Sequence, residues 1–235
     1  MSAPLQIDII TIFPHMLDGV LGESILKRAS AGGAVVFRTI DLRDFTSDRH
    51  RTTDDRPFGG GPGMIIKPEP VFLAVESVRT PESDVILMTP QGRPFRQAVA
   101  KELAERKHLI FVCGHYEGVD ERIRKSLVTD EISIGDYVLT NGVLAAAVVV
   151  DAVVRLRPGV LGGEGALDEE SFSGGRLEYP QFTRPAEFRG MPVPEVLLSG
   201  DHVAIRTWRH KMAADRTRER RPDLLDSQTA IKGNA

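Results

Sequence analysis

Several features that would identify whole classes of protein are missing from this sequence. It has 235 residues but a single cysteine, which excludes an internal disulfide and is typical of a reducing compartment. Its N-terminus has no basic segment followed by an apolar one, so we expect no secretory signal. The longest wholly apolar run, Val143 to Val150, is too short to cross a bilayer. We therefore expect a cytoplasmic protein without a membrane partner.

The signatures of several catalytic classes are missing too. No Gly-x-Ser-x-Gly nucleophile motif occurs, and the histidines are scattered. Cys113 and His115 are a close pair but lack further convergent ligands, so we predict no metal site and interpret Cys113 as a small core residue. The glycine-rich run Phe58–Met64 has backbone N–H groups for a phosphate, yet lacks the Lys-Ser/Thr of a P-loop. A tight crossing of chain segments explains this run equally well.

Charge is nearly balanced overall but unevenly distributed. The formal net charge is -3, from 30 basic and 33 acidic residues. Residues 205–221 contain seven basic and two acidic side chains, a net charge of +5, which leaves -8 for the rest. A basic segment on an acidic body is expected where one region binds a polyanion. A solvated helix face is the alternative interpretation.

The hydrophobic pattern predicts an α/β fold with a mainly parallel sheet. Short apolar runs typical of buried strands alternate with stretches of helical periodicity. The highly apolar helix predicted at 143–155 should be buried on most sides, and Pro94 should begin another helix. The predicted strands lie at 5–10, 35–40, 85–88, 109–113 and around 132–133, and the predicted helices at 15–31, 70–78, 94–103, 118–127 and 143–155.

Three of these strands break into glycine-bearing loops, which begin at Thr89, Gly114 and Ile134. Loops at the carboxyl ends of strands are where open α/β sheets bind ligands, so the three could line one pocket. Apart from Arg93 these loops contain no arginine or lysine. A pocket of backbone amides with Tyr116, Glu117, Asp136 and Tyr137 suits an uncharged or cationic adenosine-like ligand better than a polyphosphate.

The C-terminal third has a different character. Residues 158–180 are rich in glycine, serine and acidic residues, which favours a linker or mobile loop. Beyond it, Asp201 is placed to cap a last helix that carries the arginines. Composition alone favours a solvated acidic loop for residues 168–170, and a helix C-terminal cap for Arg155.

Seven sequence blocks occur together in one order over nearly the whole chain, among them Cys113-Gly-His-Tyr-Glu-Gly and Ser133-Ile-Gly-Asp-Tyr. Taken together they resemble the bacterial tRNA (guanine-N(1))-methyltransferases, of the SPOUT class whose methyl-donor site is a deep trefoil knot. The blocks are Ile10–Pro14, Phe58–Met64, Cys113–Arg122, Ser133–Leu139, Pro158–Gly162, Tyr179–Pro185 and Pro194–His202.

The resemblance implies a knotted α/β domain at 1–160, a flexible linker at 161–178 and a helical tRNA-binding domain at 179–235. It implies an obligate homodimer with shared active sites, and S-adenosylmethionine as methyl donor; Mg²⁺ assistance is not readable from the sequence. The implied donor-binding residues are Thr89, Pro90, Gly114, Tyr116, Glu117, Ile134, Gly135, Asp136, Tyr137, Val138, Leu139, Asn141 and Gly142.

The implied substrate is the guanine immediately 3′ of a tRNA anticodon, with the anticodon arm held by the C-terminal domain. Because guanine N(1) carries a proton at neutral pH, transfer needs a general base and a cation near the carbonyl oxygen. The family's linker carboxylate corresponds to Glu170 and its arginine to Arg155, and the linker would order over the flipped base. The implied tRNA-binding residues are Gly59, Arg184, Ser199, Asp201, His202, Arg209 and Arg216.

Two positions depart from the family pattern. The base is usually Asp, so either the linker backbone accommodates the longer Glu170, or Asp168 or Glu169 acts instead. After Leu139 the family commonly has Gly-Gly-Glu-Leu-Pro, where this chain has Asn141-Gly-Val-Leu-Ala. We expect Asn141 to keep the turn by adopting the left-handed conformation.

Two other functions are the alternatives. A related knotted methyltransferase could act on another RNA position, such as a ribose 2′-oxygen, but it would not need the Arg155–Glu170 pair. A non-catalytic RNA-binding protein could keep the donor pocket after losing its base.

Overall fold

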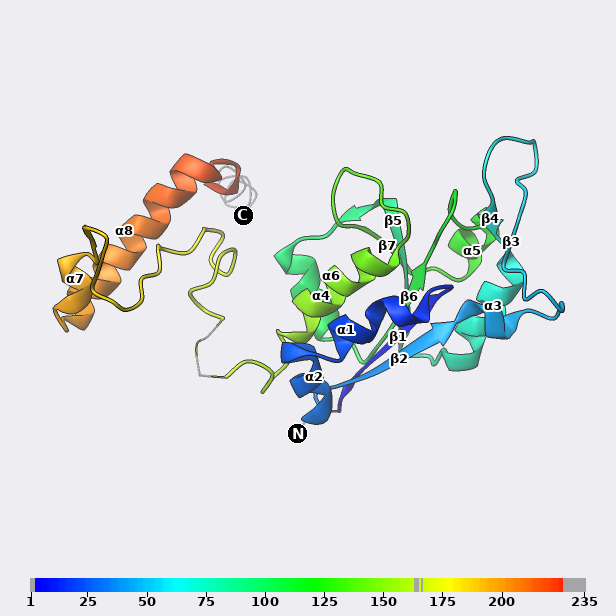
Figure 1. Ribbon diagram of the computed structural model, residues 1–235, viewed down its shortest axis with the longest axis horizontal. Helices are drawn as coiled ribbons and strands as arrows, with labels where there is room; N and C mark the ends of the chain where they lie inside the picture. The colour runs from blue at the N-terminus through cyan, green and yellow to red at the C-terminus, as the bar shows by residue number, and fades with distance from the viewer. Residues whose placement is uncertain (1–2, 163–164, 166, 226–235) are drawn as a thin grey trace, which may run out of the picture. The chain divides into compact units, whose positions relative to one another are not determined.

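The computed structural model describes residues 3–162, 165 and 167–225. The chain forms two compact units that divide after Gly162, close to the predicted end of the first domain at residue 160 (Figure 1). A linker separate from both domains at 161–178 stays a prediction. No helix in the described part of the chain combines the length and apolar character that a membrane-spanning segment requires.

The first unit is built on a five-stranded parallel sheet, which confirms the predicted α/β class. The strand order is β2-β1-β6-β5-β7, so the central strand β6 lies between β1, at the start of the chain, and β5. β6 is buried at every position, as its uninterrupted apolar run predicts. The strands are β1 (Leu5–Thr11), β2 (Val35–Asp41), β5 (Ser83–Pro94), β6 (His108–Cys113) and β7 (Asp130–Ser133).

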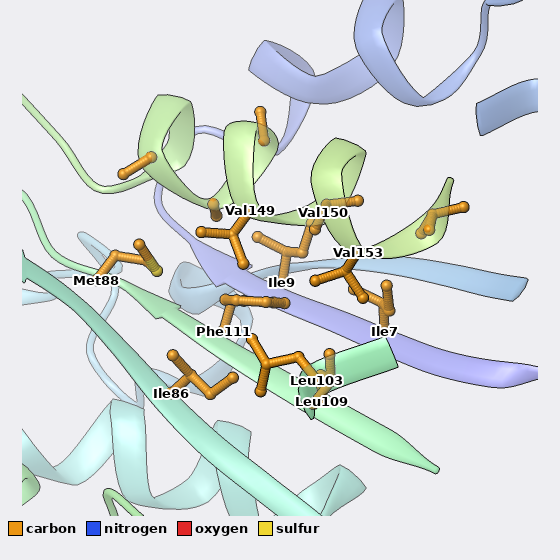
Figure 2. Close-up of a cluster of buried hydrophobic side chains, with 14 of the residues drawn as sticks. Ile7, Ile9, Ile86, Met88, Leu103, Leu109, Phe111, Val149, Val150 and Val153 are labelled. Atoms are coloured by element: carbon orange, nitrogen blue, oxygen red, sulfur yellow. The ribbon is translucent and has the colours of Figure 1, made fainter. Parts of the chain in front are cut away.

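Two apolar clusters cover the two faces of this sheet. One contains residues of α2 (Ser24–Ala31), α4 (Gln97–Ala104) and α6 (Val143–Val154), and the other residues of α3 (Pro68–Val78) and α5 (Glu121–Ser126). Figure 2 shows valines of α6 facing Ile9 and Phe111 of the sheet. α6 is mostly buried as predicted, although Leu144 and Val148 remain 47% and 50% exposed.

Two predicted helices begin or run differently from the sequence prediction. Residues 15–31 are three pieces, η1 (Pro14–Leu17), α1 (Asp18–Leu21) and α2, because the chain turns at Gly22 and Ser24 takes a positive φ of 49°. Pro94 lies in β5 and α4 begins only at Gln97. Pairing with β7 explains this difference, since Phe95 N donates to the carbonyl oxygen of Ser133 at 2.7 Å.

β5 pairs with β7 twice. Ile86–Met88 pair with residues 130–132, and Arg93 and Pro94 then pair with Ile132 and Ser133. The intervening residues 89–92 therefore fold back against the sheet at its carboxyl edge. This requires glycine at position 92, because a Cβ atom there would overlap the backbone of Glu131 and Ile132.

A short hairpin carries the glycine-rich run. It consists of β3 (Asp54–Asp55) and β4 (Ile65–Ile66), paired antiparallel, and follows the short helix η2 (Leu42–Phe45). The root of the hairpin is attached to the sheet's carboxyl edge, because Ile66 N donates to Gly118 O and Asp120 N to Ile66 O.

The helices and strands described in the second unit are β8 (Glu187–Phe188), β9 (Met191–Pro192), α7 (Glu195–Leu198) and α8 (His202–Arg220). The Asp201 side chain accepts hydrogen bonds from Val203 N and Ala204 N, which confirms it as the cap of the last helix. In the same unit Leu177 N donates to the hydroxyl of buried Thr217 on α8 at 2.9 Å.

A buried polar network, which the sequence did not reveal, joins four strands at the opposite end of the sheet from the loops. Asp8 is fully buried on β1 and accepts two hydrogen bonds from Arg38 of β2, both at 2.7 Å. It also lies 2.7 Å from His108 of β6, whose other ring nitrogen lies 2.6 Å from Ser83 of β5. The Asp8 carboxylate raises the pKa of Arg38.

We expect Asp8→Asn to lower the free energy of unfolding by about 1 to 3 kcal/mol, the usual cost of disrupting the hydrogen bonds of a buried polar group, because Asp8 is fully buried while Arg38 is 47% exposed and can be solvated. The control is Asp84→Asn. Its ion pair with Arg106 lies at the surface, and such pairs contribute at most about 1 kcal/mol. Urea unfolding followed by circular dichroism, at one protein concentration, measures both. Equal losses in the two variants would contradict the assigned role of Asp8.

Candidate functional site

The three glycine-bearing loops meet at one pocket of about 340 Å³ at the carboxyl edge of the sheet. They reach it because parallel strands end on the same side, and the double pairing of β5 with β7 turns residues 89–91 toward the other two loops. All the predicted donor-binding residues line this pocket except Asp136.

The loop after β6 is a tight turn closed by backbone hydrogen bonds. Gly118 N donates to His115 O, and Tyr116 takes a positive φ of 57° at the turn. His115 packs edge-on against both Phe13 and Tyr116. Tyr116 is 46% exposed toward the pocket, and partial burial together with the nearby Asp54 carboxylate raises the pKa of its phenol.

The loop from Ile134 to Gly142 closes the other side. Tyr137 Oη donates to Ile134 O at 3.3 Å, and Gly142 N donates to Gly114 O at 2.9 Å, which joins two of the three loops. The expected left-handed conformation of Asn141 is wrong. Asn141 instead accepts a hydrogen bond from Val143 N through its side-chain oxygen at 2.9 Å, and so supports the start of α6.

A cation that the loop sequences do not contain lines this pocket. Arg124 of α5 is one of the lining residues and donates to the side-chain oxygen of Gln91. Arg93, the single basic residue of the loops, is instead hydrogen-bonded to Asp130 and Glu102, which raises the pKa of its guanidinium. Arg124 lies one helical turn into α5. The composition of the loops therefore does not reveal it, and the sequence does not show that this helix borders the pocket.

The glycine-rich hairpin crosses the Gly114–Gly118 loop closely. Glu117 N donates to Met64 O at 3.0 Å, and a Cβ atom on Gly63 would overlap the Glu117 side chain. At Gly63, therefore, the interpretation as a tight crossing of chain segments explains the glycine. Gly59 lies farther out in the hairpin beside Phe58, which is fully exposed.

Cys113 is a core residue at the end of β6. It is 3% exposed, and burial raises the pKa of its thiol. Together with Met88 it packs against Gly142, where a Cβ atom would lie 3.0 Å from Cys113 Cα and 3.1 Å from Met88 Cβ. The described residues hold no group of three His, Cys, Asp or Glu side chains that could bind a metal ion.

The two predicted catalytic residues belong to different units. Arg155 is the C-terminal cap of α6, where its N–H donates to Asp151 O. Glu170 lies in the second unit, in a turn whose hydrogen bond runs from Ser173 N to Glu170 O at 3.1 Å. Glu170, Asp168 and Glu169 line a small hollow of about 100 Å³ beside Arg209 of α8. The pairing of Arg155 with Glu170 stays a prediction.

The predicted tRNA-binding residues other than Gly59 all lie in the second unit. Asp201 and Ser199 hold the turn before α8, since Ser199 Oγ accepts from Asp201 N and donates to Val196 O. Arg184 lines a hollow with Phe182 and Trp208, whose rings lie 6.4 Å apart. The remaining three residues lie on α8 and are His202, Arg209 and Arg216.

Replacement of Gly142 by alanine should crowd the junction of the pocket loops with β5 and β6. We expect a loss of about 1 to 3 kcal/mol in the free energy of unfolding, as for other overpacked core positions. Gly19→Ala is the control, because a Cβ atom there meets nothing within 4 Å. A thermal or urea unfolding curve with no difference between the two variants would show that the junction is not tightly packed.

The single thiol of the chain should be protected in the folded protein. Because only the thiolate reacts and burial raises the Cys113 pKa, a thiol reagent at pH 8 should modify the native chain far more slowly than the chain in denaturant. Rapid modification of the native protein would contradict a buried Cys113.

Comparison with known proteins identifies the family. Residues 5–227 match the family model of the tRNA (Guanine-1)-methyltransferase TrmD. The chain is 58% identical over 223 residues to the tRNA (guanine-N(1)-)-methyltransferase of Staphylococcus epidermidis, covering 94% of this chain and 91% of that protein. It is 58% identical to the enzyme of the same name from Geobacillus kaustophilus, with coverages of 94% and 92%, and 57% identical to that of Bacillus cereus, with coverages of 97% and 95%. The chain belongs to the tRNA (guanine-N(1))-methyltransferase family.

Proposed function

We propose that this chain transfers a methyl group from S-adenosylmethionine to N(1) of the guanine immediately 3′ of a tRNA anticodon. The observation that carries the proposal is the single pocket made by three strand-end loops in a chain of this family. The names of the relatives specify tRNA, guanine and N(1). The position beside the anticodon comes from the resemblance of the seven sequence blocks.

The pocket suits the proposed donor chemically. Most of the residues that line it are uncharged, with Glu117 and Glu121 as anionic groups and Arg124 as a cation. This balance favours a neutral adenosine attached to a charged amino-acid group over a polyphosphate. S-adenosylmethionine supplies an electrophilic methyl group on a sulfonium. The loop residues from Thr89, Gly114 and Ile134 onward would hold and orient it.

We also propose that the chain is knotted at this pocket, as in the SPOUT class. The support is that β5 stops pairing with β7 after Met88, loops out, and pairs with β7 again at Arg93 and Pro94. Gly92 and Gly142 both allow chain segments to approach within van der Waals contact at this place, as a threaded chain requires.

The chain's own residues would manage the proton and the charge. Guanine N(1) carries a proton that must leave as the methyl group arrives, so a carboxylate has to accept it. Glu170 is the proposed base. Arg155 is proposed to lie near the guanine carbonyl oxygen, where negative charge develops. Asp168 and Glu169 remain the alternatives for the base.

The second unit is proposed to bind the anticodon arm. α8 carries most of the +5 segment, and Arg206, Lys211, Arg218 and Arg220 on it are exposed to solvent. Exposed cations on one helix attract the phosphate backbone.

The proposal includes a homodimer with shared active sites, working in the cytoplasm. Leu144 and Val148 support the dimer, since these apolar side chains are half exposed on one side of α6, the helix that follows the donor pocket. In a dimer, Arg155 at the end of α6 could serve a site completed by the partner's second unit.

Methyl transfer from labelled donor to two tRNA transcripts tests the proposed function. One transcript carries guanine just 3′ of the anticodon, and the other carries adenine there. N(1)-methylguanosine should form from the first alone. Label in both transcripts, or at a ribose oxygen, would indicate the related knotted methyltransferase. Donor binding without any transfer would indicate the non-catalytic alternative.

Glu170→Gln should lower kcat by about 10² to 10⁴, the usual contribution of a general base, because the amide cannot take up the N(1) proton. Donor binding measured by calorimetry should be nearly unchanged. Glu187→Gln, at an exposed position of β8, serves as the control and should keep full activity. Full activity of Glu170→Gln would transfer the role of base to Asp168 or Glu169.

A further inference from the structure

The acidic segment of the second unit is folded, and its hydrogen bonds fix the backbone around residues 168–173. Ser173 Oγ donates to the carbonyl oxygens of both Asp168 and Glu170 at 2.7 Å. Ser171 Oγ accepts a hydrogen bond from Glu178 N at 3.1 Å. These contacts close a compact turn between the three consecutive carboxylates and the segment around Glu178.

The Glu169 side chain attaches this turn to α8. Tyr179 Oη donates to Glu169 Oε2 at 2.7 Å, and Arg209 Nη1 lies 3.4 Å from the same oxygen. The Arg209 guanidinium also stacks 4.6 Å above the Tyr179 ring. Three side chains from the turn, from the segment before β8 and from α8 therefore form one cluster, which we call the Glu169 cluster.

The chemistry of the cluster favours a stable acceptor role for Glu169. Partial burial, followed by the hydrogen bond to Glu169, raises the pKa of Tyr179, so the phenol keeps its proton and continues to donate. Glu169 Oε2 already accepts from this phenol and faces the Arg209 cation. A carboxylate with these two partners links the acidic turn to α8.

We propose that Glu169 is a positioning residue: through Tyr179 and Arg209 it fixes the acidic turn on α8, so that Glu170 is carried to the donor pocket together with the RNA-binding helix. This inference rests on the proposed function and deepens it. It assigns different roles to adjacent carboxylates, with Glu169 holding and Glu170 reacting. It also gives Arg209 a role inside the unit, in addition to the predicted contact with tRNA.

The strength of the cluster fits positioning better than folding. Glu169 and Arg209 are 54% and 37% exposed, and ion pairs at such sites contribute at most about 1 kcal/mol. Loss of the cluster should therefore leave the unit folded. Misplacement of a reacting group by about 1 Å, in contrast, can cost about 10²-fold in rate.

The test measures kcat and the KM values of donor and tRNA for full-length variants acting on the tRNA transcript with guanine 3′ of the anticodon. Glu169→Ala and Tyr179→Phe should each lower kcat about tenfold or more, with the KM for the donor unchanged. Glu169→Gln should keep most of the activity, because its amide oxygen still accepts from Tyr179. The double variant Glu169→Ala/Tyr179→Phe should be no slower than the slower single variant, since both remove one hydrogen bond.

Several results would overturn the proposal. Glu169→Gln as inactive as Glu170→Gln would make Glu169 the base. Unchanged kcat in Glu169→Ala and Tyr179→Phe, or additive losses in the double variant, would show that the cluster does not position Glu170. Circular dichroism of each variant checks that the chain is folded. Failure of the unmodified chain to methylate guanine would refute the proposed function, and is distinguishable from all these results.

Discussion

The structure depends on one constraint, the return of β5 to β7 after a four-residue excursion. Strands in a parallel sheet normally pair once, but here Met88 and Arg93 both pair with Ile132. The return is possible because Gly92 brings backbone against backbone, where any side chain would collide. It moves the loop that starts at Thr89 over the sheet's carboxyl edge, displaces the start of α4 to Gln97, and leaves a pocket walled by the other two loops.

The residues proposed for the chemistry are divided between the two units. The first unit holds the proposed donor pocket and ends α6 with Arg155, while the second carries the acidic turn and the arginines of α8. The proposed reaction needs residues of both units, and the proposed binding of tRNA by α8 is suited to ordering the acidic turn for it. The Glu169 cluster adds a physical reason why the carboxylates would move with α8, the proposed RNA-binding helix. The Asp8 network lies at the other end of the sheet from the loops and ties neighbouring strands to one another there.

Much of this could be predicted from the sequence. The strands follow from their apolar runs, and the shared pocket follows from parallel strands whose loops emerge on one side. The cap at Asp201 is also predictable, because it depends only on neighbouring residues. Two features that the sequence does not predict depend on partners distant in sequence. Pro94 is held in β5 by pairing with β7, and Arg124 reaches the pocket from a helix. At Asn141 the difference is local: the sequence predicts a left-handed backbone, whereas the side chain accepts a hydrogen bond from Val143 N two residues later. The networks around Asp8 and Glu169 join residues whose proximity no periodicity encodes.

The central claim is that the three strand-end loops bind the methyl donor, and a crystal structure of the chain with S-adenosylhomocysteine, the demethylated form of the proposed donor, tests it most directly. The account predicts the adenosine between the loops that begin at Thr89, Gly114 and Ile134, with the amino-acid part in the same pocket. A ligand bound elsewhere, or a pocket that remains empty at saturating ligand, would contradict the claim.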